Sequence, residues 1–289
     1  MTYPARRASY PPPPLAARGP SALRRHGWLA VLVVGTALFS AVERTLVATD
    51  NPHLVPTAIL LGAAIVPAAF LAFVYGRRLV YRVSPVVIAG SALLGGVVGT
   101  VTAGALEFDA QRDLGVLSMA GVGLIEEGSK LLVPLAVLVL FPRYRTRADG
   151  LLIGVAAGAG FAALETMGYA FTTLLQSKGS VTATVDVLLL RGLMSPAGHM
   201  AWTGIAVAAL YAAAESGWAV RRAAGFLGAA ALAVTLHALW DSRTTMAGTA
   251  VVAVVGLAAL GWAVHRTAHV RRPVHHAAHY TLRYSRTAR

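Results

Sequence analysis

Long apolar segments recur along this chain of 289 residues and restrict what it can fold into. A helix needs about 20 apolar residues to cross a hydrocarbon layer of about 30 Å. Candidate segments lie at 28–48, 56–75, 84–106, 114–141, 150–175, 187–214, 224–241 and 246–264. Because 56% of the residues are hydrophobic and only 13% are charged, a soluble domain of this size is excluded. We predict an all-α, polytopic membrane helix bundle of about eight transmembrane helices.

The positions of the arginines predict the orientation of this bundle in the membrane. Arginines precede the first segment and follow the second, fourth, sixth and eighth, which places them on one side if the helices alternate. By the positive-inside rule that side is the cytoplasm, so both termini are predicted to be cytoplasmic. The opposite loops are assigned five acidic residues, Asp50, Glu107, Asp109, Asp113 and Asp186. Orientation and attraction to the anionic lipid bilayer explain the net charge of +13, and no nucleic-acid partner is assigned.

Two terminal segments lie outside the apolar region. Residues 1–27 are rich in Pro and Arg and are predicted to be a disordered tail. For residues 24–48 a retained anchor is favoured over a cleaved signal peptide, because the apolar run exceeds the about 7 to 15 residues of a signal core. Residues 28–264 form one membrane domain, and 265–289 are a basic His/Arg-rich tail, favoured over a metal-binding tract. The chain has no cysteine, which excludes cysteine-protease chemistry.

Ionisable residues interrupt four consecutive apolar segments. The fourth contains Glu126, Glu127 and Lys130, and three uncompensated charges near the bilayer centre would cost roughly 10 kcal/mol. Glu126 and Lys130 are four residues apart, so they can pair on one face of a helix. The next three segments contribute further polar side chains, namely Glu165, His199, His237 and Asp241. Their coincidence on neighbouring segments indicates a functional cluster.

The depths of these groups in the membrane, calculated from the rise of a helix, allow them to meet. At about 1.5 Å per residue, Glu126 and Glu165 lie roughly 18 and 15 Å below the outer ends of their segments. His199 and His237 lie within a few turns of theirs, so all four fall in the outer half. Taken singly, each histidine is explained by helix packing, and Glu165 by pairing with Lys130. Ser195, which precedes Pro196, is predicted to cap the start of the helix that carries His199.

Four motifs, in order along the chain, resemble those of the PrsW family of bacterial intramembrane proteases. They are Glu126-Glu127-x-x-Lys130, Phe161-x-x-x-Glu165, His199 followed by Met-Ala-Trp-Thr-Gly, and His237-x-x-x-Asp241. This family is related to the CAAX-prenyl endopeptidase and bacteriocin-processing group. The resemblance covers about residues 28–264. Thr166 departs from the pattern, which has asparagine after the glutamate.

The resemblance implies an intramembrane endopeptidase of the bacterial plasma membrane that uses glutamate-activated water. Glu126 or Glu127 would be the general base. Spacing does not select between them, and Glu126 is preferred by analogy with the related group. The other residues would orient groups, balance charge and surround the developing oxyanion, and they are Lys130, Glu165, His199, His237 and Asp241.

The resemblance leaves metal dependence open, because members are described both as metalloproteases and as glutamate proteases. Glu165, His199 and His237 would suffice as zinc ligands that leave a position for water. However, the local HExxH motif of zinc-dependent membrane proteases is absent, and the ligands would come from separate helices. No cofactor is therefore favoured, and zinc is the alternative.

Other mechanisms fit the sequence less well. Gly-x-Gly-Asp and Gly-x-Ser-x-Gly motifs are absent, which disfavours aspartyl and serine intramembrane proteases. The alternative function is a proton-coupled membrane transporter that uses the buried Glu, Lys and His side chains, but no inverted repeat is evident. For a protease with its site in the outer half, the expected substrate is a single-span membrane protein, such as an anti-sigma-like factor, cut near its extracytoplasmic boundary.

Overall fold

The computed structural model describes residues 21–242 and 245–268, and within them the chain is helical without strands, which confirms the predicted all-α class. The elements are α1 (Ala22–Thr49), the short 3-10 helix η1 (Pro52–Leu54), α2 (Val55–Tyr75), α3 (Pro85–Leu114), α4 (Met119–Lys130), α5 (Leu132–Leu140), α6 (Arg147–Gln176), α7 (Val181–Met194), α8 (His199–Glu215), α9 (Val220–Ser242) and α10 (Met246–Ala268). Helix α1 thus begins inside the segment assigned to the N-terminal tail, and the rest of both predicted tails lies outside the described residues.

Seven helical segments of the described chain are long and apolar enough to cross a membrane. They are α1, η1 with α2, α3, α6, α7 with α8, α9, and α10. The remaining expected span, 114–141, is broken at Leu131 into α4 and α5. Pro134 explains the break, because it lacks an N–H and its ring clashes with the carbonyl of Lys130 in a continuous helix.

The expected span 187–214 also contains a break. Helix α7 ends at Met194 and α8 begins at His199, with Pro196 between them. The prediction that Ser195 caps the start of the following helix is wrong, because Ser195 caps the end of α7 and its hydroxyl donates to the carbonyl of Arg191 at 2.9 Å. His199 is nevertheless the first residue of α8.

Four of the five acidic residues assigned to outer loops lie in helices instead, whereas Asp50 does follow the end of α1. Glu107, Asp109 and Asp113 belong to the last turns of α3, and Asp186 belongs to α7. The cause is that both helices extend beyond the apolar segments that mark them in the sequence. This correction brings Glu107 within reach of the membrane-embedded groups.

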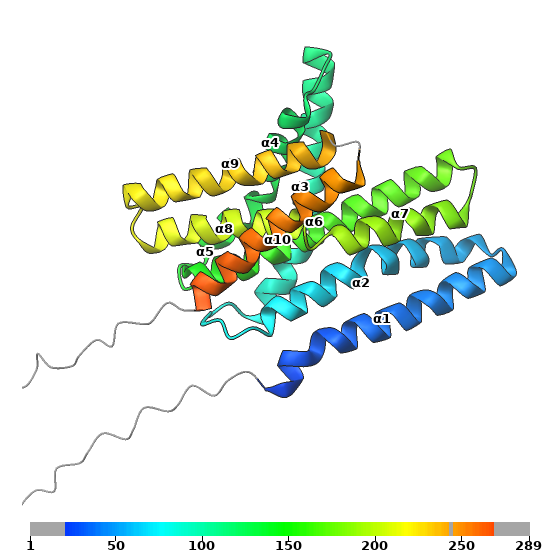
Figure 1. The fold of residues 1–289 in the computed structure, drawn as a ribbon, viewed down its shortest axis with the longest axis horizontal. Coiled ribbons are helices and arrows are strands. Elements are labelled where there is room, and N and C mark those ends of the chain that lie inside the picture. Colours follow the sequence, from blue (N-terminus) through cyan, green and yellow to red (C-terminus); the bar gives the residue numbers. More distant parts are fainter. Residues whose placement is uncertain (1–20, 243–244, 269–289) are drawn as a thin grey trace, which may run out of the picture.

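The turns that carry arginine gather at one end of the bundle (Figure 1). This arginine end contains the start of α1, the end of α10 and the turns α2–α3, α5–α6 and α8–α9, with Arg24, Arg77, Arg143, Arg222 and Arg266 among its residues. The turns α1–α2 and α6–α7 lie at the opposite end. The described ends of the chain therefore share one side, and the assignment of that side to the cytoplasm stays a prediction.

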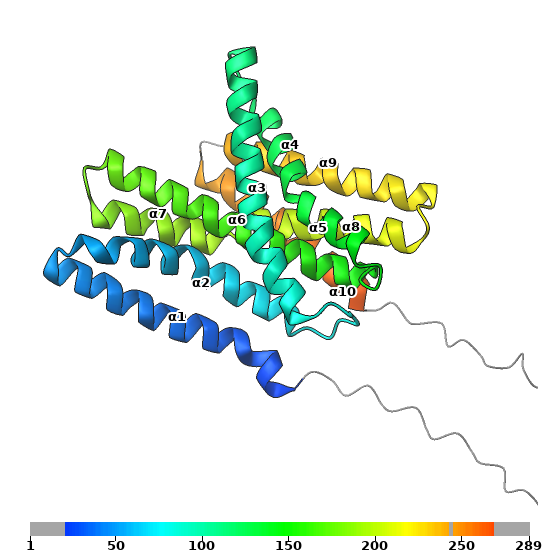
Figure 2. The same ribbon diagram turned by 180° about the vertical axis from the view of Figure 1, so that it is seen from behind.

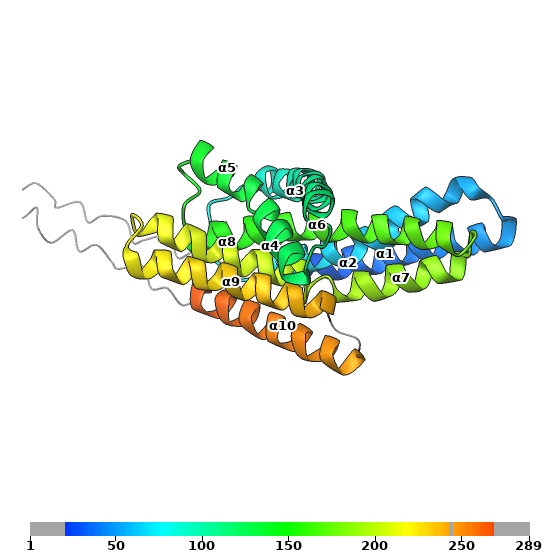
Figure 3. The same cartoon turned by 90° about the horizontal axis from the view of Figure 1, so that it is seen from above.

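Helix α3 runs across the direction of the other long helices. In Figure 2 it passes in front of α6, and in Figure 3 it is seen almost end-on while α6, α9 and α10 lie in the plane of the view. Small residues permit this crossing. A Cβ added at Gly95 would lie 2.7 Å from Cβ of Ala157, and one at Gly96 would lie 2.7 Å from the backbone of Gly160. The two helices therefore touch backbone to backbone.

Helix α6 meets α8 in the same way, and this contact positions the site. Gly150, Gly154 and Gly158 face α8, and a Cβ added at Gly154 would lie 2.7 Å from the carbonyl oxygen of Thr203. A Cβ at Gly158 would collide with the carbonyl oxygen of His199. The small-residue pair Gly154 and Gly158 thus sets the distance between α6 and the first turn of α8.

Buried Asp149 fixes the start of α6. Its carboxylate accepts hydrogen bonds from the backbone N–H groups of Arg82 (2.6 Å) and Val83 (2.9 Å) in the α2–α3 turn. It also accepts from the hydroxyl of Thr146 at 2.7 Å and completes a capping box with that residue. One carboxylate therefore ties two turns of the arginine end together.

Candidate active site

Lys130 stands at the centre of a buried polar cluster. Its side chain is wholly inaccessible, and its Nζ lies 3.1 Å from Oε2 of Glu126 and 2.8 Å from Oε1 of Glu127. The same Nζ lies 2.8 Å from Nδ1 of His199 and 4.0 Å from the ring centroid of Phe161. Two carboxylates and an aromatic face thus surround the ammonium, which offsets the cost of its burial.

His199 is held between two oppositely charged groups. Its Nδ1 faces the Lys130 ammonium, while its Nε2 lies 2.7 Å from Oε2 of Glu165 on α6. An ammonium group can only donate hydrogen bonds, so Nδ1 of His199 must accept and Nε2 carries the proton. The surroundings therefore select one neutral tautomer, with its N–H directed at Glu165.

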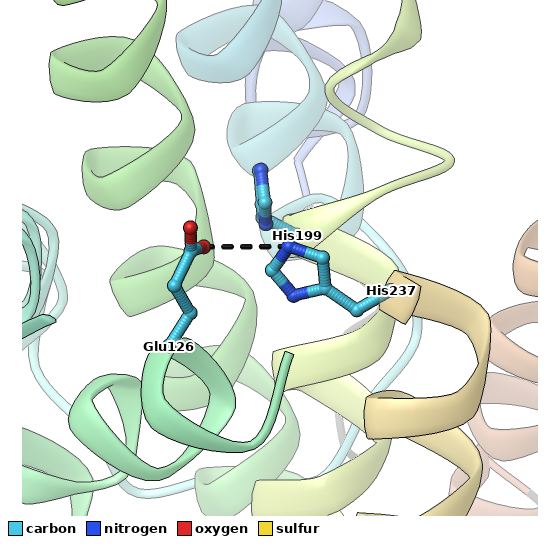
Figure 4. Close-up of side chains that lie close together, drawn as sticks. All are labelled: Glu126, His199 and His237. Atoms are coloured by element: carbon cyan, nitrogen blue, oxygen red, sulfur yellow. Dashed lines mark ion pairs between the residues drawn. The ribbon is translucent and has the colours of Figure 1, made fainter. Parts of the chain in front are cut away.

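His237, from α9, is surrounded by carboxylates. Its Nδ1 lies 2.9 Å from Oε1 of Glu127, and its Nε2 lies 3.4 Å from Oε2 of Glu126 and 3.2 Å from Oδ2 of Asp241. Figure 4 shows the His237 ring turned toward Glu126, with His199 beside it. Both ring nitrogens face oxygen atoms, an arrangement that a doubly protonated ring satisfies with two N–H donors.

Arg191 completes the ion pairs of the site. Its Nη2 lies 2.7 Å from Oε2 of Glu165, and its guanidinium carbon lies 3.8 Å from the ring centroid of Tyr169. Glu165 is therefore shared between Arg191 of α7 and His199 of α8. The sequence reasoning missed Arg191, although a cation inside an apolar segment is the same signal that singled out Lys130.

An aromatic wall backs the two histidines. The Trp202 ring is fully buried, and its centroid lies 5.4 Å from that of His199 and 5.1 Å from that of His237. Phe161 approaches His199 from another side, with ring centroids 5.3 Å apart. These rings restrict the orientation of both imidazoles and exclude water from that side of the cluster.

Access to the cluster comes from a cavity of about 360 Å³ lined by residues of α3, α4 and α6. Three carboxylates, those of Glu107, Glu126 and Glu165, lie in its wall. Glu127 does not line the cavity, because its carboxylate points toward Lys130 and His237 and forms ion pairs with them. The rotation of α4 thus presents Glu126 rather than Glu127 to an incoming molecule. Glu107 is the second residue that the sequence reasoning missed at this site.

The donor set of the cluster fits a zinc ion. One ligand atom each from Glu126, His199 and His237 lies within 4.8 Å of the others, and two histidines with one carboxylate are typical of catalytic zinc. The carboxylate of this set differs from that of the set inferred from sequence, because Glu165 is engaged by Arg191 and His199. The Lys130 ammonium contacts an oxygen of Glu126 and a nitrogen of His199, two of the three residues of this set.

All seven residues singled out in the sequence come together, from α4, α6, α8 and α9. A buried cluster of glutamate, histidine and lysine inside a bundle of membrane-length helices is typical of a functional site in a membrane-embedded enzyme or transporter. The model of the PrsW family, described as intramembrane metalloproteases, matches residues 84–265. The chain therefore belongs to the PrsW family of intramembrane proteases. The match contains the whole cluster and leaves out α1 and α2. No curated protein and no solved structure matches the chain.

Proposed function

We propose that this multi-pass membrane protein is a glutamate-dependent intramembrane endopeptidase in which Glu126 is the general base. The observation that carries the proposal is the difference between the paired glutamates. Glu126 lines the cavity, whereas Glu127 is enclosed by Lys130 and His237. A base must reach both the water and the peptide bond, and of this pair only Glu126 meets that requirement.

The chemistry assigned to the chain begins with a water molecule in the cavity. Glu126 takes one proton from this water while the water oxygen bonds to the peptide carbonyl carbon. The carbonyl oxygen then carries negative charge, which the Lys130 ammonium and the doubly protonated ring of His237 stabilise, while Glu165 holds the ring of His199 and Asp241 that of His237. The C–N bond breaks as the proton on Glu126 passes to the leaving nitrogen. A carboxylic acid and an amine leave, and the Glu126 carboxylate is restored.

Lys130 is the reason for proposing the glutamate-type version. Its ammonium already balances Glu126 and Glu127 and holds the tautomer of His199, which are tasks a metal would otherwise perform. If zinc is bound, Glu126, His199 and His237 would hold it, and it would supply Lewis-acid activation of water. A chelator separates the two versions.

The proposed substrate is a single-span membrane protein of the bacterial plasma membrane, such as an anti-sigma-like regulatory factor. The cavity opens between α3 and α6 and combines carboxylates with the apolar side chains of Phe161 and Leu164. Such a wall suits a partly unwound apolar segment, whose backbone N–H groups have lost their helical partners.

The test uses the full chain in lipid vesicles with a model single-span substrate. We expect Glu126→Gln to lower cleavage at least about a hundredfold, the scale of losing a general base. Glu43→Gln in α1, outside the family match, is the matched control and should cleave normally. A strong chelator should leave the wild-type rate unchanged.

Three outcomes would count against the proposal. Loss of cleavage with the chelator, restored by zinc, would replace the glutamate-type mechanism with a zinc mechanism. Full activity of a folded Glu126→Gln variant would remove Glu126 as the base. Proton flux without cleavage, lost in that variant, would favour the transporter.

A further inference from the structure

A second cavity lies at the arginine end of the bundle, away from the candidate active site. It has a volume of about 440 Å³ and is lined by residues of α6, α8, α9 and α10. Its wall contains four arginines, Arg147, Arg221, Arg222 and Arg266. The protease mechanism uses none of them, and the cavity shares no residue with the active-site cavity.

The positive charge in this cavity is not balanced within the described residues. No ion pair to any of the four guanidinium groups occurs in residues 21–242 and 245–268, and Nε of Arg147 is buried without a hydrogen-bond partner. Glu215 is the nearby acid, but its carboxylate accepts from the backbone N–H of Arg147, at 3.2 Å. Helices α6 and α9 begin here while α8 and α10 end here, so their dipoles offset one another and the arginines supply the positive potential. Four like charges around one hollow favour an anion.

The rest of the wall indicates what carries the anionic group. Ile205, Trp262 and several alanines make the cavity apolar beside the arginines. The Trp262 ring is more than half exposed, and the guanidinium carbon of Arg266 lies 4.7 Å from its centroid. Tryptophan beside arginine is typical of the depth where lipid headgroups meet acyl chains. A ligand with a charged head and an apolar tail matches both parts of the wall.

We propose that this cavity binds the headgroup of an anionic phospholipid. The phosphate contacts the arginines of α6, α9 and α10, since one guanidinium group can donate two parallel hydrogen bonds to two oxygens of a phosphate. The acyl chains lie along Trp262 and the apolar residues of α8. A lipid held there joins the starts of α6 and α9 to the end of α10, and so it stabilises the helices that carry Glu165 and His237.

The test is lipid binding by the full chain, measured by native mass spectrometry in detergent. Phosphatidylglycerol, zwitterionic phosphatidylcholine and inorganic phosphate are titrated separately. The wild type should bind phosphatidylglycerol at least about tenfold more tightly than phosphatidylcholine, because the attraction acts on net negative charge. Inorganic phosphate at millimolar concentration should not displace the lipid, which also uses the apolar wall.

Two double variants with equal loss of charge locate the site. Arg221→Gln with Arg222→Gln removes two cavity arginines and should weaken phosphatidylglycerol binding at least about tenfold. Arg143→Gln with Arg145→Gln removes two exposed arginines of the α5–α6 turn, outside the cavity, and should change it less than about twofold. Circular dichroism and gel filtration check that both variants are folded.

Equal losses in the two double variants would overturn the proposal in favour of diffuse surface charge. Displacement of the lipid by inorganic phosphate would also overturn it, because the site would then recognise a free phosphoryl group. A second readout is quenching of tryptophan fluorescence by brominated phosphatidylglycerol. The quenching should fall in Trp262→Phe, and no difference from the wild type would place the lipid elsewhere.

Discussion

The Nζ of Lys130 lies 2.8 Å from Nδ1 of His199, although the two residues are 69 positions apart in the chain. Two helix breaks make this contact. Helix α4 ends at Lys130, ahead of Pro134, and α8 begins at His199, after Pro196. The last residue of α4 and the first residue of α8 thereby meet in the interior of the bundle, which places the Lys130 ammonium beside the His199 imidazole.

Replacing Lys130 tests the central charge of the cluster. Lys130→Met leaves the buried carboxylates of Glu126 and Glu127 without their partner, so the free energy of unfolding should fall by roughly 3–5 kcal/mol and cleavage should be lost. Thermal unfolding followed by circular dichroism, together with a cleavage assay, measures both effects. Combining Lys130→Met with Glu127→Gln removes one of the two buried carboxylate charges that lost their partner. The double variant should recover part of the stability without recovering cleavage. Recovery of cleavage in the double variant would mean that Lys130 serves stability alone.

The helices themselves were predictable, because long apolar runs with arginine-rich turns leave few alternatives in a bilayer. Their breaks were not evident from hydropathy, because the run around Pro134 is continuously apolar. A proline alone does not decide where a helix stops, since α2 continues through Pro67. Similarly, Ser195-Pro196 fits the start of a helix by local rules, but tertiary packing makes Ser195 the end of α7.

The residue types of the site could be read from the sequence, whereas their pairing could not. Spacing places Glu126 and Glu127 about 100° apart on a helix but leaves the rotation of that helix free. Packing fixes the rotation, since Gly123 of α4 lies against His237 and the carbonyl of Val234 in α9. The crossing of α3 over α6 depends in the same way on Gly95 and Gly96, and Glu107 of α3 lines the cavity between these two helices.

The close approach of α6 and α8 should be sensitive to a single methyl group. A Cβ at Gly158 collides with the backbone of His199, so Gly158→Ala should shift α8 and lower cleavage at least about tenfold, since small displacements of catalytic groups are costly. Gly90 of α3 has open space around it, and Gly90→Ala should leave cleavage unchanged and preserve or raise stability. Cleavage rates of the two folded variants decide the matter. Equal rates would show that the α6–α8 contact does not position His199.

Asp149 should contribute to stability without taking part in catalysis. Asp149→Asn keeps the shape but replaces an acceptor oxygen with an NH₂ group facing backbone donors, which should cost about 1–3 kcal/mol. Asp113→Asn is the matched control, because Asp113 is exposed and pairs with neighbouring Arg112, and it should change stability by less than about 1 kcal/mol. Chemical denaturation in detergent compares the two. Similar unfolding midpoints would contradict the role assigned to Asp149 at the start of α6.

The arginine end should face the cytoplasm. Reporter fusions at Arg145 and Arg222 should therefore report an inside location, and a fusion near Lys178, in the α6–α7 turn at the opposite end, an outside one. Moving the reporter within each turn controls for local effects. An inside signal at Lys178 would reverse the orientation and with it the side from which substrate is cut.

The depth of the cluster predicts where the substrate is cleaved. Glu165 lies 11 residues before the end of α6 at Gln176 and 18 residues after its start at Arg147, so it is roughly 17 Å from one end and 27 Å from the arginine end. His237 is likewise 5 residues before the end of α9 and 17 after its start. Water and an unwound peptide thus reach the site over the shorter path from the end opposite the arginines. With the arginine end inside, a single-span substrate should be cut in its extracytoplasmic half or just beyond it, as mass spectrometry of the fragments would reveal. Fragments that end only in the cytoplasmic half would show that substrate enters from the arginine end, against the path inferred from α6 and α9.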